Sequence, residues 1–150
     1  MATPTTATPY LTVRDAARAL DFYTRAFGAR ETLRLTAPGG TRIGHAEIDV
    51  GGARIMLADE FPEMGARGPE TIGGTPVTIA LQVPDVDEFV RRAVVEGATL
   101  ARPVSDQFYG ERAGMLTDPF GHRWHVSTHV EDVPADEMQR RYEAMVKQQQ

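Results

Sequence analysis

The chain has 150 residues, of which 41% are hydrophobic and 25% charged, and it contains no cysteine. This length corresponds to one ordinary domain or two very small ones, and the absence of cysteine excludes disulfides, thiolate nucleophiles and cysteine-ligated metal sites. The net charge of -5 and the scattered basic residues argue against nucleic-acid binding. No apolar run approaches the ~20 residues of a membrane helix. Residues 1–6 lack the basic and apolar regions of a secretory signal, so we expect a cytoplasmic protein with no membrane association.

The sequence contains an imperfect internal repeat. Residues 11–15 (LTVRD) resemble residues 81–85 (LQVPD) at an offset of 70, and residues 52–57 resemble residues 121–126 at an offset of 69. A segment with helical periodicity follows each copy of the first motif and ends at Gly-Ala, where glycine favours the C-terminal end of a helix. The repeat predicts two copies of one structural unit.

In each half the pattern of apolar and turn residues predicts a strand, a helix and three further strands. In the first half the strands are expected near 7–13, 30–36, 42–50 and 53–59, and the helix at 15–27. In the second half the strands are expected near 76–83, 98–103, 112–117 and 122–129, and the helix at 85–96. Tight turns are expected at Gly51-Gly52 and at 118–121. Neither half is able to bury a sheet face alone, so residues 1–150 are expected to form one domain of two modules, about 7–59 and 76–129, with a linker at 60–75.

A further helix is expected over about 134–147. Proline is favoured at the first helical position, and acidic residues are favoured in the first turn, as at Asp136 and Glu137. Met138, Tyr142 and Met145 then form an apolar stripe. This stripe is expected to pack on the sheet of its own chain or on a partner subunit.

Side chains alternate across a strand, so each predicted sheet has two faces. One face is apolar and is expected to pack on the helices; its members are Leu11, Val13, Ile48, Val50, Ile55, Leu57, Val77, Ile79, Leu81, Val83, Trp124 and Val126. The opposite face is polar without being rich in Lys and Glu; it includes Tyr10, Thr12, His45, Glu47, Arg54, Met56, Gln82, Arg123 and His125. The polar face either lines a cleft for a small molecule or is simply solvated. The repeat favours the cleft, because it places the two sheets in a similar relation.

The order of elements and several motifs resemble the vicinal oxygen chelate superfamily, which includes glyoxalase I, bleomycin-resistance proteins and extradiol dioxygenases. The motifs are residues 11–15, 21–23, 27–29 and the closing segment 118–124 (DPFGHRW). Residues 45–47, 59–65, 106–112 and 128–133 narrow the resemblance to the PhnB-like branch. The resemblance covers about residues 7–130 and implies an α+β fold, in which two tandem βαβββ modules form a curved sheet that encloses a cleft.

The resemblance also implies where a metal would be held in metal-dependent members. The four ligand positions fall at Thr8, Met56, Thr78 and His125. Threonine hydroxyls and a methionine sulfur are poor ligands for the usual divalent metals, so neither the usual metal centre nor any other cofactor is expected. A non-standard set of His45, Glu47 and His125 remains as an alternative, since three N/O ligands with an open position are typical of catalytic metal sites.

Two further roles are open for the polar face. His125 and Glu47 would act in metal-free acid/base catalysis, since histidine titrates near neutrality. Alternatively, the protein sequesters a drug as bleomycin-resistance proteins do. Phe108 and Tyr109 would then cover a flat ligand, together with Phe61 and Met64 of the linker.

The prediction is therefore a glyoxalase/bleomycin-resistance-like protein, expected to be a homodimer, that binds a small organic molecule and either sequesters it or transforms it without the usual metal. The ligand-binding residues expected beside His125 and Glu47 are His45, Tyr10, Arg54, Met56, Gln82, Phe108, Tyr109 and Arg123. His122 and Trp124 are expected to be structural, and His129 to lie too far along its strand to reach the site.

Overall fold

The computed structural model describes residues 2–150 and contains two four-stranded sheets of the same topology. The first has the strand order β1-β4-β3-β2, and the second has the order β5-β8-β7-β6. In the first module the elements are β1 (Tyr10–Val13), α1 (Ala16–Phe27), β2 (Arg30–Thr36), β3 (Ile43–Val50) and β4 (Ala53–Asp59). In the second they are β5 (Thr78–Gln82), α3 (Val86–Val95), β6 (Thr99–Asp106), β7 (Glu111–Thr117) and β8 (Arg123–His129). The α+β class and the two tandem modules are confirmed.

The same local signals build both modules. Asp15 and Asp85 cap the two helices, each accepting a hydrogen bond from the backbone N–H three residues later. Gly51 and Gly52 join β3 to β4 with φ of 58° and 100°, a conformation that favours glycine at both positions. Repetition of the caps and turns explains why the repeat in the sequence predicts the repeat in the fold.

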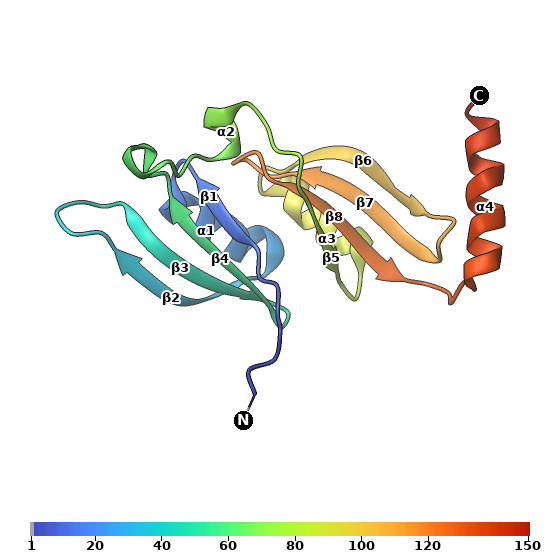
Figure 1. Cartoon of the computed structure of the whole chain (residues 1–150), viewed down its shortest axis with the longest axis horizontal. Coiled ribbons are helices and arrows are strands. Elements are labelled where there is room, and N and C mark those ends of the chain that lie inside the picture. Colours follow the sequence, from blue (N-terminus) through green and yellow to red (C-terminus); the bar gives the residue numbers. More distant parts are fainter. Residues whose placement is uncertain (1) are drawn as a thin grey trace.

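The apolar sheet faces pack against α1 and α3, which contact each other on the same side of the two sheets (Figure 1). Aromatic rings join the modules: the ring of Phe27 lies 4.9 Å from those of both Phe89 and Trp124, measured between centroids. Trp124 is fully buried, as expected. Val77 is the exception on the predicted apolar face, because it precedes β5 and is 61% exposed.

The element boundaries differ from prediction at a few places. β1 begins at Tyr10 and not at residue 7, and β5 begins at Thr78 and not at residue 76. Pro9 has no N–H to donate to a ladder, although its carbonyl accepts a hydrogen bond from Met56. β6 extends to Asp106 and does not end at residue 103 as predicted. The linker contains two short helices, η1 (Pro62–Met64) and α2 (Pro69–Ile72).

The C-terminal helix α4 (Ala135–Gln148) stands apart from the two modules (Figure 1). Pro134 precedes the helix as its N-cap residue, where the sequence predicted that it would be the first helical residue. None of the side chains of α4 is buried, and Tyr142 is 48% exposed. The apolar stripe of α4 therefore borders an open space.

The two sheets do not close around a common cleft. No ladder joins a strand of one sheet to a strand of the other within residues 2–150, and the polar residues form separate clusters on the two sheets. The expected sheet that encloses one cleft is thus open in a single chain. No helix among the described residues has the length and apolar character needed to cross a membrane.

Candidate functional site

Four polar side chains form a continuous network on the first sheet. The Tyr10 hydroxyl lies 2.7 Å from His45 Nδ1, and His45 Nε2 lies 2.7 Å from a Glu47 carboxylate oxygen. The other Glu47 oxygen accepts a hydrogen bond from Arg54 Nε at 3.1 Å and forms an ion pair with Nη2 of the same guanidinium at 2.9 Å. Met56 lies beside Glu47 and Tyr10 in the strand register. We call Tyr10, His45, Glu47 and Arg54 the His45 cluster.

The His45 cluster fixes the tautomer and orientation of the imidazole. An ionised Glu47 only accepts hydrogen bonds, so His45 Nε2 donates to it, and in the neutral ring Nδ1 accepts from Tyr10. The hydrogen bonds from His45 and then from Arg54 hold the pKa of Glu47 below its ordinary value of 4.5. Glu47 is therefore a carboxylate at neutral pH, and both nitrogens of His45 are engaged.

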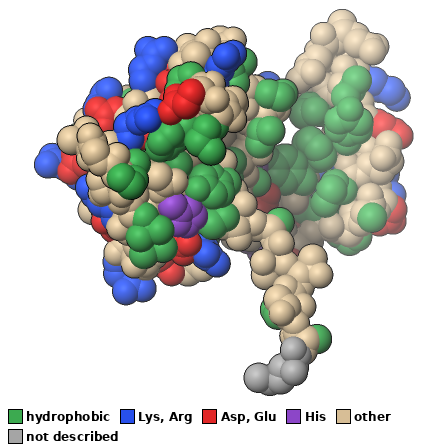
Figure 2. Space-filling model, turned by 60° about the vertical axis from the view of Figure 1, so that its left-hand side comes forward, with side chains coloured by type: hydrophobic (Ala, Val, Ile, Leu, Met, Phe, Trp, Pro, Cys, Tyr) green, Lys and Arg blue, Asp and Glu red, His purple; other side chains and the backbone are tan. Residues whose placement is uncertain are grey.

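A cavity of about 530 Å³ lies on the second sheet, between its polar face and α4. We call this the α4 cavity; its walls include Arg102, Gln107, Phe108, Tyr109, Met115, His125 and Met145. Figure 2 shows the hollow beside α4 with hydrophobic side chains facing into it. The α4 cavity thus combines aromatic and thioether surfaces with a small number of polar groups.

Tyr109 and His125 form the polar centre of the α4 cavity. The Tyr109 hydroxyl lies 2.9 Å from His125 Nε2. Burial, and then the nearby charge of Glu111, raise the pKa of Tyr109 above its ordinary value of 10.0, and Arg102 opposes this shift. The phenol therefore stays protonated at neutral pH and is able to donate a hydrogen bond to His125 Nε2.

Phe108 and α4 shape the outer wall of the cavity. The Phe108 ring lies 5.1 Å from the ring of Tyr109 and 5.6 Å from that of Tyr142 on α4. Arg141 donates a hydrogen bond to the Phe108 carbonyl oxygen at 3.1 Å and pairs with Glu131 at 2.7 Å. These contacts attach α4 to the loop that carries Phe108 and Tyr109.

The remaining predicted ligand-binding residues lie outside the α4 cavity. Gln82 donates to Glu111 at 2.6 Å. Arg123 borders a separate hollow beside the linker.

The other two histidines, His122 and His129, lie outside the α4 cavity. His122 Nε2 lies 2.9 Å from the Thr12 carbonyl oxygen, which is a contact between the modules. His129 pairs with Asp132 at 2.7 Å at the exposed end of β8.

The two linker residues that were expected to help cover a ligand, Phe61 and Met64, do not line the α4 cavity. Phe61 packs under the Arg42 guanidinium, 4.2 Å from the ring centroid, and Met64 is 80% exposed.

The two predicted catalytic residues have different partners. Glu47 belongs to the His45 cluster on the first sheet, whereas His125 bonds with Tyr109 on the second. Among residues 2–150 no group of three or more His, Asp or Glu side chains lies close enough to hold a metal ion. A single chain therefore does not assemble the alternative His45, Glu47 and His125 metal set.

The positions that hold a metal in metal-dependent relatives do not fit one here. Met56 offers only a thioether, which accepts a long contact from Arg54 at 3.8 Å, and Thr78 is an exposed neutral hydroxyl. Thr8, which precedes β1, offers a neutral hydroxyl as Thr78 does. His125 is therefore the one good metal ligand among the four positions. We derive no catalytic step through a metal.

Sequence reasoning missed Arg102, Met115 and Met145 as cavity residues. Arg102 and Met115 lie on β6 and β7, whose faces the alternation pattern did not assign, although Met115 is directly opposite His125. The position of Met145 depends on where α4 docks, which periodicity alone does not give.

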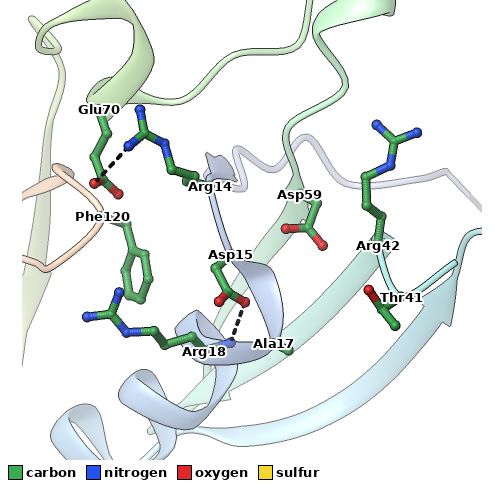
Figure 3. A pocket seen from close by; sticks show the side chains of 9 residues that line it. All are labelled: Arg14, Asp15, Ala17, Arg18, Thr41, Arg42, Asp59, Glu70 and Phe120. Atoms are coloured by element: carbon green, nitrogen blue, oxygen red, sulfur yellow. Dashed lines mark hydrogen bonds and ion pairs between the residues drawn. The ribbon is translucent and has the colours of Figure 1, made fainter.

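A second hollow lies at the N-terminal end of α1, and most of its charged groups already have partners (Figure 3). Arg14 points toward Glu70, and Asp15 caps the helix. The buried Asp59 accepts hydrogen bonds from the backbone N–H groups of Ala16 and Ile43 at 2.8 and 2.7 Å. These hydrogen bonds stabilise the junction of α1, β3 and β4.

Comparison with known proteins agrees with the two-module architecture. The model of the Glyoxalase/Bleomycin resistance protein/Dioxygenase superfamily matches residues 5–126. The chain belongs to this superfamily. Similar superfamily structures include TioX from Micromonospora sp. ML1, with 32% identity and a TM-score of 0.66 over 85% of this chain and 100% of that one.

Other relatives extend the comparison without assigning an activity. Protein PA1353 from Pseudomonas aeruginosa has 25% identity and a TM-score of 0.68, covering 85% of this chain and 100% of that one. The uncharacterized protein Rv0887c of Mycobacterium tuberculosis is 46% identical over 134 residues, covering 87% of this chain and 78% of that protein. A PhnB protein from Bacillus cereus, at 15% identity and a TM-score of 0.62, over 83% of this chain and 99% of that one, shares the fold of the superfamily.

Proposed function

We propose that this protein binds a small planar organic molecule in the α4 cavity, as a glyoxalase/bleomycin-resistance-like protein that works without the usual metal. The observation that carries the proposal is the cavity itself. Its volume of about 530 Å³ lies within the range of small-molecule sites. Its walls combine apolar and aromatic side chains with polar ones, which include the Tyr109 and His125 pair and Arg102.

The wall residues suit a flat ligand. Phe108 and Tyr109 present ring faces and edges, which favour aromatic partners. Met115 and Met145 are flexible and polarisable, so they adapt to the outline of a ring system. Within the described residues, His125 Nδ1 forms no hydrogen bond, which leaves it available to a polar group of the ligand.

Titration with N-phenyl-1-naphthylamine, a neutral aromatic dye that fluoresces when bound in apolar sites, tests the proposal. We expect saturable binding that Tyr109→Ala or Met145→Ala weakens about tenfold, because each removes a wall of the site. Val95→Ala, at an exposed position on α3, is the control and leaves the affinity unchanged. Absence of saturable binding, or equal affinity in all four proteins, would disprove the proposal.

Metal-free turnover is the second candidate, and the His45 cluster favours it. The imidazole of His45, oriented by Glu47 through Nε2, is suited to moving a proton at Nδ1 when an enolisable substrate takes the place of the Tyr10 hydroxyl there. The hemithioacetal of methylglyoxal followed by NMR in deuterated water is the assay. A catalyst that uses both sheets would lose turnover in His125→Ala or Glu47→Gln and keep its ligand affinity, whereas a sequestering protein shows no turnover in the wild type.

We further propose a cytoplasmic homodimer. The first sheet exposes Tyr10, Leu33 and Leu35, which are 50%, 39% and 53% exposed, and both sheets are open. Pairing of two chains would cover these side chains. Light scattering coupled to size-exclusion chromatography measures the mass directly, and Leu35→Asp is expected to shift a dimer toward the monomer. A monomeric wild type at micromolar concentration contradicts this part of the proposal.

A further inference from the structure

Three side chains form a row across the second sheet at the base of the α4 cavity. Arg102 on β6 is directly opposite Met115 on β7, which is directly opposite His125 on β8. Directly opposed residues share a face, and neighbouring strands are about 4.8 Å apart. The backbone positions of Arg102 and His125 are therefore about 10 Å apart, with Met115 between them.

Arg102 is the one wall residue of the α4 cavity that is fully charged at neutral pH. Two other arginines on the sheets have acidic partners: Arg112 pairs with Asp87 at 2.8 Å, and Arg54 with Glu47 at 2.9 Å. Arg30 and Arg123 form no ion pair within residues 2–150, but neither of them lines the α4 cavity. Arg102 forms no ion pair within residues 2–150. Its charge acts on Tyr109, which places the two side chains in the same electrostatic environment.

The position of Arg102 is equivalent to an uncharged position on the first sheet. The corresponding row on the first sheet runs Leu33, Glu47, Met56, as the strand registers show. Leu33 occupies the place of Arg102, and the acidic Glu47 occupies the place of Met115. The two copies have thus diverged so that the second row has an arginine and lacks the carboxylate that would neutralise it.

We propose that the ligand of the α4 cavity is a planar aromatic acid whose anionic group pairs with Arg102. This inference rests on the proposed function of the cavity. The ring system lies over Met115, between Phe108 and Met145, and a polar atom at the far end meets the Tyr109 and His125 pair. Arginine is suited to this role because its planar guanidinium binds carboxylate or sulfonate oxygens in a bidentate manner.

Two dyes that differ by one anionic group test the inference. The first, 1-anilinonaphthalene-8-sulfonate, is N-phenyl-1-naphthylamine with an added sulfonate. We expect Arg102→Gln to weaken binding of the sulfonated dye about 5- to 10-fold, as for a partly exposed charge-assisted hydrogen bond, and to leave the neutral dye unaffected. Arg102→Lys retains part of the affinity. Arg30→Gln, which removes an exposed arginine on β2, is the matched control and changes neither dye.

Ionic strength supplies a second readout. Raising NaCl from about 0.05 to about 0.5 M is expected to lower the affinity of the wild type for the sulfonated dye, because salt screens the charged contact. The affinity of Arg102→Gln for this dye should not change. Thermal midpoints confirm that each variant is folded. If both dyes bind and Arg102→Gln affects neither, the inference is wrong and the proposed function stands. If neither dye saturates, both are wrong.

Discussion

At the scale of single residues, Asp118 is the side chain that connects the two modules most directly. Its carboxylate accepts hydrogen bonds from Trp124 Nε1 at 2.9 Å, from the backbone N–H groups of Phe120 and His122 at 2.9 and 3.0 Å, and from the Tyr23 hydroxyl on α1. Burial, and then the charge of Asp118, raise the pKa of Tyr23 well above 10.0, so the phenol remains a donor. Four donors compensate the burial of this carboxylate.

Asp118→Asn is therefore expected to destabilise the protein. An amide keeps the shape but cannot accept from all four donors, so the free energy of unfolding should fall by about 2–4 kcal/mol. Urea unfolding followed by tryptophan fluorescence measures the change. Asp21→Asn is the control: Asp21 is exposed and paired with Arg25, and its loss should cost less than about 0.5 kcal/mol. Equal effects of the two substitutions would show that Asp118 is not a structural anchor.

The pKa of Glu47 predicts how the stability of the protein depends on pH. Its folded-state pKa is depressed, so its contribution to stability is present above the unfolded-state pKa and is lost as pH falls through the folded-state value. Carbon-13 NMR titration of the Glu47 carboxyl should show a pKa below 4.5, and His45→Ala should raise it more than Arg54→Ala, following the order of the causes. An unchanged pKa in both variants would contradict the network.

At the scale of elements, the loop between β6 and β7 depends on Gly110. This residue has φ of 88°, and a side chain there would overlap the Glu131 carbonyl oxygen and approach Val133 Cγ2 to 2.9 Å. The Gly110 carbonyl accepts hydrogen bonds from Val130 and Glu131 at 2.9 and 3.0 Å. The loop that presents Tyr109 is thus packed against the segment that leads into α4.

Gly110→Ala is expected to lower the free energy of unfolding by about 2–4 kcal/mol, because it combines an unfavourable φ with a backbone clash. It should also weaken binding of N-phenyl-1-naphthylamine, because the loop and α4 form walls of the cavity. Gly39→Ala is the matched control, with φ of 76° and open space around the glycine. Its expected cost is about 1 kcal/mol. Thermal and urea unfolding measure the loss of stability in both variants. Equal losses would show that the unfavourable φ alone is responsible and that overlap with the Glu131 carbonyl adds nothing.

Elements were predictable where their signals are local. The helical periodicity after residues 15 and 85, the Gly51-Gly52 turn and the alternation along the strands all act within a few residues. Strand ends were less predictable, because they depend on a partner strand. β6 extends to Asp106 because β7 is available to pair with Ser105 and Asp106.

At the scale of the whole molecule, the two modules share one core. The rings of Tyr23 and Phe27 on α1 lie 5.9 and 4.9 Å from that of Trp124 on β8, measured between centroids. Removing one module would expose these aromatic surfaces on the other. The modules are therefore structural repeats that we expect to depend on each other for folding.

We expect the full chain to unfold in one cooperative transition, and residues 1–75 and 76–150 produced separately to lack one. The physical reason is that each fragment loses the aromatic contacts and the Asp118 hydrogen bond to Tyr23. Circular dichroism during heating measures this, with the intact chain as the reference. A sharp thermal transition in either isolated fragment would contradict a shared core.

The sequence by itself determined the repeat, the order of the elements, the buried face of each sheet and the unsuitability of Thr8, Met56 and Thr78 as metal ligands. These properties follow from alternation, capping and side-chain chemistry, which are local. Only the tertiary structure decided that Glu47 and His125 have separate partners, that α4 forms a wall beside Met115, and that Arg102 is unpaired within the described chain. These features depend on strand register and helix docking, which bring together residues that are distant in sequence.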